Sequence, residues 1–78
     1  QMTANDRIIS LVRPEYIENI PSFTRDHAKS CTCGFIAREY PELYSRFEAD
    51  TEPNEQEKQE MAMIVNELFR ERLDKHHV

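Results

Sequence analysis

A chain of 78 residues holds one small core, and its hydrophobic fraction of 38% and charged fraction of 32% are those of a folded domain, not a disordered one. The whole negative excess of −5 lies in residues 48–60 and the rest of the chain is balanced, which does not match the basic stripe with which proteins displace counterions from nucleic acid. We therefore expect a single domain, 1–78, in a small acidic protein that does not bind nucleic acid.

The cysteines and the distribution of apolar residues predict the cellular compartment of the protein. Two cysteines one residue apart cannot form the disulfide framework of small secreted proteins. The sequence shows no signal-peptide pattern and no apolar run long enough to cross a bilayer. We expect a cytoplasmic protein with reduced cysteines and no contact with a membrane.

Prolines divide the first half of the chain into short predicted helices. Pro14 and Pro41 suit the first turn of a helix, and Pro21 interrupts the chain between them. Thr3 or Asn5 can cap a helix that ends before Pro14. The apolar residues of these segments recur at helical spacing and should face a common core: Ile8, Ile9, Leu11, Val12, Tyr16, Ile17, Ile20, Leu43, Tyr44 and Phe47.

The middle segment contains both cysteines and the single glycine, in the stretch RDHAKSCTCGF, residues 25–35. Four residues spaced four apart form one stripe of a helix, widened by Ala28 and Ile36, which we interpret as a core face with Cys31 the more buried cysteine: Phe23, His27, Cys31 and Phe35. The weak helix formers around Gly34 predict a break or kink there, and Gly34 itself could let another helix approach closely.

The last segment predicts a long helix from Pro53 to Lys75, about 34 Å in length at 1.5 Å per residue. Asn54 or Thr51 can cap it, and residues 48–60 (EADTEPNEQEKQE) hold the negative excess, with six acidic residues and one lysine. We interpret this acidic block as a solvated loop and helix start, with docking on a basic partner as the alternative. No segment alternates with the period of a strand, so the sequence predicts an all-α bundle of four to five helices.

A zinc site is the chemical alternative for the cysteine segment. His27, Cys31 and Cys33 could share an ion with His76 or His77. Structural zinc sites usually space their cysteines two to four residues apart, and here a single residue separates them. We therefore expect no metal and no other cofactor.

No catalytic signature is present, because the chain lacks a triad pattern, a phosphate-binding glycine loop and a dinucleotide fingerprint. The apolar stripe of the last helix is longer than the short upstream helices can cover, which favours a partner chain. We expect a non-enzymatic protein that binds another protein, like adaptors or the small inhibitors of phages and mobile elements, and that forms a homodimer. The residues expected to contact the partner are Met61, Ile64, Val65, Leu68, Phe69 and Arg72.

Two alternatives keep the helical fold but change its role. Residues 15–29 could form a helix-turn-helix of a transcriptional regulator, with Arg25 and Lys29 facing DNA, although the usual turn glycine is absent. The other alternative is a zinc-stabilised helical module of either kind.

Overall fold

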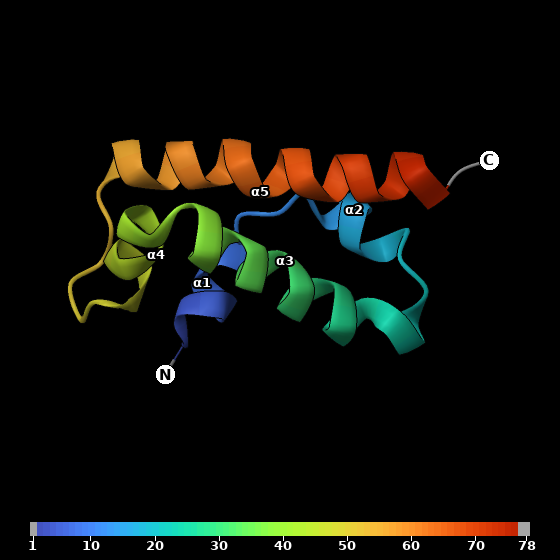
Figure 1. Ribbon diagram of the computed structural model, residues 1–78, viewed down its shortest axis with the longest axis horizontal. Coiled ribbons are helices and arrows are strands. Elements are labelled where there is room, and N and C mark those ends of the chain that lie inside the picture. Colours follow the sequence, from blue (N-terminus) through green and yellow to red (C-terminus); the bar gives the residue numbers. More distant parts are fainter. Residues whose placement is uncertain (1, 77–78) are drawn as a thin grey trace.

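The computed structural model describes residues 2–76, which form five α-helices, one short 3₁₀ turn (η1) and no strand within that range (Figure 1). The all-α bundle with a long last helix is therefore confirmed. The elements are α1 (Ala4–Ile9), α2 (Pro14–Glu18), η1 (Ser22–Thr24), α3 (Arg25–Glu39), α4 (Pro41–Glu48) and α5 (Glu55–His76).

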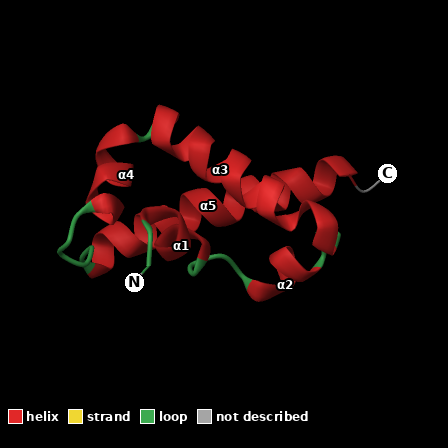
Figure 2. Ribbon diagram, turned by 90° about the horizontal axis from the view of Figure 1, so that it is seen from below, coloured by secondary structure: helices red, strands yellow, loops and turns green. Residues whose placement is uncertain are grey.

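Helix α5 runs along the length of an elongated molecule measuring 40 × 22 × 21 Å, and the other helices pack on one side of it (Figures 1 and 2). The α4 helix lies near the beginning of α5, and α2 lies against its second half. Helix α3 approaches α5 with its C-terminal half and diverges from it toward Arg25 (Figure 1). No helix in residues 2–76 is both long and apolar enough to cross a membrane.

The core lies between α5 and the shorter helices. Its side chains come from every α-helix except α2 and from the segments that flank α2. Burial of these apolar groups is the main source of stability in a chain of this size. The buried apolar residues are Ile8, Val12, Ile20, Ala28, Cys33, Ile36, Phe47, Met61, Val65 and Phe69.

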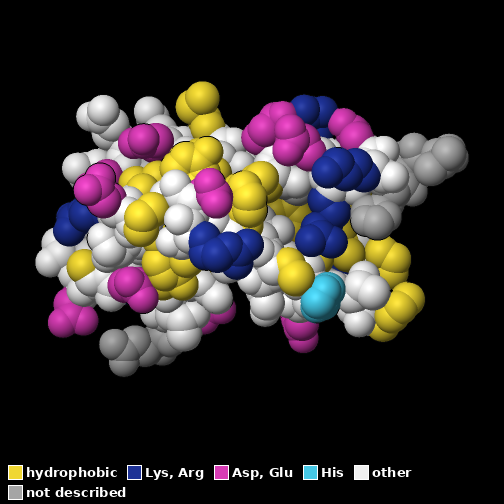
Figure 3. All heavy atoms as spheres, viewed as in Figure 1, with side chains coloured by type: hydrophobic (Ala, Val, Ile, Leu, Met, Phe, Trp, Pro, Cys, Tyr) yellow, Lys and Arg dark blue, Asp and Glu magenta, His cyan; other side chains and the backbone are white. Residues whose placement is uncertain are grey.

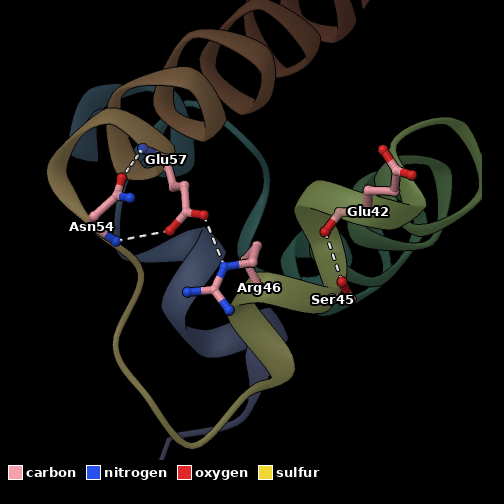
Figure 4. A network of polar contacts seen from close by, with 5 residues as sticks. All are labelled: Glu42, Ser45, Arg46, Asn54 and Glu57. Atoms are coloured by element: carbon pink, nitrogen blue, oxygen red, sulfur yellow. Dashed lines mark hydrogen bonds and ion pairs between the residues drawn. The ribbon is translucent and has the colours of Figure 1, made fainter.

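Helix α5 begins at a capping box, two residues after the predicted start at Pro53 (Figure 4). The side-chain oxygen of Asn54 accepts the backbone N–H of Glu57 at 2.8 Å, and the Asn54 N–H donates to the Glu57 carboxylate at 2.9 Å. The other carboxylate oxygen of Glu57 accepts from Nε of Arg46 at 2.8 Å. One glutamate therefore caps α5 and joins it to α4.

Helix α3 is continuous through Gly34, so the predicted break is wrong. A Cβ added at Gly34 would meet, within 4 Å, only a guanidinium nitrogen of Arg38, 3.7 Å away on the same helix. The predicted close approach of a second helix at Gly34 is therefore also wrong. The helical bonds of the flanking residues are sufficient to hold one glycine in helical conformation.

The buried face of α3 differs from the predicted one by about one residue around the helix. Cys31 is exposed and Cys33 is 1% exposed, the reverse of the prediction. The face packed against the other helices is formed mainly by small side chains, which allow several helices to pack around α3. That buried face consists of Ala28, Thr32, Cys33 and Ile36.

Candidate protein-binding site

An open groove lies between α3 and the second half of α5, where the two helices diverge. It consists of two hollows, of about 420 Å³ and 460 Å³, which meet at Arg72. Figure 3 shows this face, with basic and apolar side chains side by side over α3 and α5. We define the α3–α5 groove by its main wall residues: Cys31, Phe35, Arg38, Leu68, Arg72 and Lys75.

The second hollow is the more apolar part of the groove. Its floor is formed by Ile20 and Pro21 next to α2, Ala28 of α3 and Leu73 of α5. Phe23 lies in η1 between Pro21 and Thr24, which both line this hollow, and its side chain is 88% exposed. A phenyl ring with so little protein contact contributes little to the core. The predicted stripe of Phe23, His27, Cys31 and Phe35 lies at the surface, whereas Ala28 and Ile36, which the sequence predicts to widen it, are buried.

Basic residues without a partner gather in the groove. Six of the ten Lys and Arg residues make ion pairs or donate to backbone carbonyls: Arg7, Arg13, Arg25, Arg46, Lys58 and Arg70. The other four make no such contact with a residue of the described range 2–76, and three of these four line the groove: Arg38, Arg72 and Lys75.

The first hollow of the groove has a positive net charge, although the net charge of the protein is negative. Glu71 is the single carboxylate on the wall of the first hollow, against three cations. The protein as a whole carries −5. A negatively charged group is therefore attracted by the wall of this hollow, although the protein as a whole is acidic.

The candidate zinc ligands do not converge. His27 and Cys31 lie one turn apart on the exposed side of α3, with 3.4 Å between Sγ and Nε2. Cys33 points to the opposite side, because two residues rotate a helix by about 200°. Its burial, and to a smaller extent the Asp6 carboxylate, raise the pKa of the Cys33 thiol to about 11.

Neither the complete predicted zinc set nor a disulfide between Cys31 and Cys33 fits these positions. No group of three possible metal ligands occurs in the described residues. His77 and the side chain of His76 lie outside what the structure describes.

The structure divides the six predicted partner-binding residues into two groups. Three of them are fully buried in the protein's own core and cannot contact a partner while the fold is intact: Met61, Val65 and Phe69. The other three are partly exposed: Ile64, Leu68 and Arg72. Of these, Leu68 and Arg72 are walls of the groove.

Sequence reasoning missed Phe35, Arg38 and Lys75 as groove residues. A signal was present, because residues 31, 35 and 38 of α3 have the same i, i+4, i+7 spacing as residues 68, 72 and 75 of α5. Each set ends in a cation. A second helical stripe beside the core stripe, with basic residues at its end, is the pattern that would have identified both walls.

Arg25 has a structural role instead of the predicted contact with DNA. Its Nε donates to the carbonyl oxygens of Ile17 at 3.0 Å and Ile20 at 2.9 Å, and its terminal nitrogen donates to that of Glu18 at 3.1 Å. These bonds satisfy carbonyls at the end of α2, where helices leave acceptors free. These internal bonds occupy the guanidinium that the helix-turn-helix alternative would need for DNA.

Several residues of the acidic block are paired within the protein. Lys58 donates to Glu52 at 2.8 Å and lies 3.6 Å from Glu55, and Glu57 accepts from Arg46. The hydrogen bond from Lys58 holds the pKa of Glu52 below its ordinary value. These local contacts agree with our interpretation of the block as a loop and helix start.

No protein-family model matches this chain, and the searches of curated proteins and of solved structures found no significant match.

Proposed function

We propose that the protein is a non-enzymatic module that binds another protein through the α3–α5 groove and Phe23. The observation that carries the proposal is the 88% exposure of Phe23 beside an apolar hollow. An exposed aromatic ring next to a concave apolar surface matches the anchors that dominate protein interfaces. Phe35, 39% exposed on the groove wall, extends the same surface.

The test compares two substitutions of exposed apolar residues. Phe23→Ser removes the proposed anchor, and Met63→Ser removes a 76% exposed side chain outside the residues that line the groove. Immobilised wild type and both variants are incubated with extract of the native cells, and the retained proteins are quantified by mass spectrometry. Neither change should alter the melting temperature by more than a few degrees, because exposed side chains contribute little to stability.

We expect a protein that the wild type and Met63→Ser retain equally and that Phe23→Ser loses. Equal retention by all three forms, or retention of no protein by any of them, would contradict the proposal. If only Met63→Ser loses the retained protein, the binding surface lies on the outer side of α5 and not at the groove.

Self-association through α5 is a second candidate, favoured by the exposed Met63 and the partly exposed Ile64 on that helix. A homodimer would melt at higher temperature as protein concentration rises, because association stabilises the folded state by mass action. Light scattering and melts over a wide concentration range, on the wild type and Met63→Glu, test this. A monomeric wild type with a constant melting temperature contradicts the dimer.

A further inference from the structure

We infer that the α3–α5 groove receives an amphipathic helix of the partner protein with acidic residues along both edges of its apolar stripe. The inference rests on the proposed function and adds the chemical class of the partner. Binding of an amphipathic helix in a groove between two helices is a common mode of peptide recognition.

The dimensions of the groove fit a helix of a few turns. The lining on this side extends from Thr24, just before α3, to Arg38, a separation of fourteen positions, or about 21 Å at 1.5 Å per residue. A helix of about 14 residues has this length. The groove is open to solvent on one side, so its walls can be reached by a helix from outside.

The charges of the two walls define the charges of the occupant. Arg38 lies on the α3 wall, and Arg72 and Lys75 lie on the α5 wall. None of the three has an ion-pair partner within the described chain, so each can pair with a carboxylate without breaking an existing contact. A helix that lies between the two walls would present acidic residues to both walls and apolar residues to the floor of the groove.

The groove lining between the cations is apolar, so the bound helix of the partner must also carry an apolar stripe. Phe35 and Leu68 lie between the basic residues, and Ile20 and Leu73 line the second hollow. Apolar residues at i, i+3 or i+4, and i+7 would bury these groups. Nucleic acid would pair with the cations but leave the apolar floor without a partner.

A second copy of this chain does not supply such a helix. Its acidic block, residues 48–60, forms a loop and the first turns of α5, and Met61, Val65 and Phe69 of the apolar stripe that follows are buried in its own core. The outer side of α5 carries Arg70 between Glu67 and Asp74, with both acids paired to it. The occupant therefore comes from a different protein.

The experiment uses three synthetic helical peptides of about 14 residues with the same leucine stripe. Their flanking positions are all Glu, all Gln or all Lys. Binding to the full chain is measured by fluorescence anisotropy at low and high salt. We expect the Glu peptide to bind at least about tenfold more tightly than the Gln peptide, with a difference that shrinks at high salt, and the Lys peptide to bind weakest.

Charge reversal in the protein supplies the matched control. Arg72→Glu or Lys75→Glu should abolish the preference for the Glu peptide, and Lys29→Glu should not. Lys29 is on the same helix as Arg38 and also lacks an ion-pair partner in the described chain, but it does not line the groove. Circular dichroism of each variant checks that the fold is retained.

Equal affinity for the Glu and Lys peptides, no binding of any peptide, or an equal effect of Lys29→Glu would overturn the inference. These results are distinguishable from failure of the proposed function. If a cellular protein still depends on Phe23 for capture while no acidic preference is found, protein binding stands and the acidic helix does not. If salt-sensitive binding of duplex DNA is found in place of peptide binding, both fail.

Discussion

The side-chain oxygen of Asn66 on α5 accepts a hydrogen bond from the backbone N–H of Arg13, with 2.8 Å between the two atoms. The amide nitrogen of the same side chain donates to the carbonyl of Leu11 at 3.0 Å and to that of Ala62 at 2.8 Å. The α1–α2 connection has no helical partners of its own for these groups. Asn66 therefore fixes the connection to the long helix.

Replacing Asn66 with Ala should destabilise the protein by about 1–3 kcal/mol, because the Leu11 carbonyl and the Arg13 amide lose their partner. Chemical denaturation at neutral pH measures the free energy of unfolding. Gln59→Ala is the control, since Gln59 is exposed on the same helix. An equal change in the free energy of unfolding for the two substitutions would show that the Asn66 side chain does not stabilise the α1–α2 connection.

Replacing Gly34 with Ala should stabilise the protein by about 0.5–1 kcal/mol. The added Cβ makes only an ordinary van der Waals contact, with the Arg38 guanidinium, so it causes no clash. Alanine also loses less backbone entropy than glycine when the helix forms. Thermal melts give the change. Ala37→Gly, at another partly exposed position of α3, should have the opposite sign, and destabilisation by Gly34→Ala would reveal a steric requirement that the structure lacks.

One cysteine should react much faster than the other with a thiol reagent on the native protein. Cys31 is exposed, whereas Cys33 is buried and the pKa of its thiol is raised to about 11. Because the thiolate is the reacting form, Cys33 should react only after unfolding. Stopped-flow absorbance with a chromogenic disulfide measures the fast phase expected from Cys31 and the slow phase expected from Cys33.

Cys31→Ser should remove the fast phase and leave the slow one. Cys33→Ser should retain the fast phase. Two equally fast thiols would contradict the assigned faces of α3.

Acid should weaken the junction between α4 and α5. Hydrogen bonds from the Asn54 N–H and from Arg46 hold the pKa of Glu57 below its ordinary value. A carboxyl with a lowered pKa in the folded state stabilises the fold above the ordinary glutamate range, and this contribution is lost as pH falls through that range to the lowered value. Glu57→Gln should be less stable than the wild type at neutral pH, with the two melting curves converging as pH falls.

Melting temperatures measured from neutral to acid pH give the comparison. Glu60→Gln is the control, because Glu60 is exposed on the same turns of α5. A constant difference between wild type and Glu57→Gln at all pH values would show that the charge of Glu57 is not the cause.

The helix ends could be predicted from the sequence because their signals are local. Pro14 and Pro41 start α2 and α4, and Asn54 caps α5, each through contacts within a few residues. The face of α3 could not be predicted in this way. Cys31 and Cys33 are both small and weakly polar, and the packing of other helices against α3 decides which one is buried.

The groove was only half predictable for the same reason. Leu68 and Arg72 were recognised on α5, but their relation to Phe35 and Arg38 depends on how two helices far apart in sequence align. A stripe pattern gives the spacing within each helix. It gives no information on which residues of a second helix stand opposite.

The separation of charge along the molecule has a kinetic consequence for a partner. The acidic block lies at the end where α5 begins, and the second half of α5, which carries Leu68, Arg72 and Lys75 of the groove, lies toward the other end of a 40 Å long axis (Figure 1). An approaching acidic helix is repelled at one end and drawn to the other, so it is oriented before contact. Salt should therefore slow association, while the lifetime of the complex depends on the apolar floor.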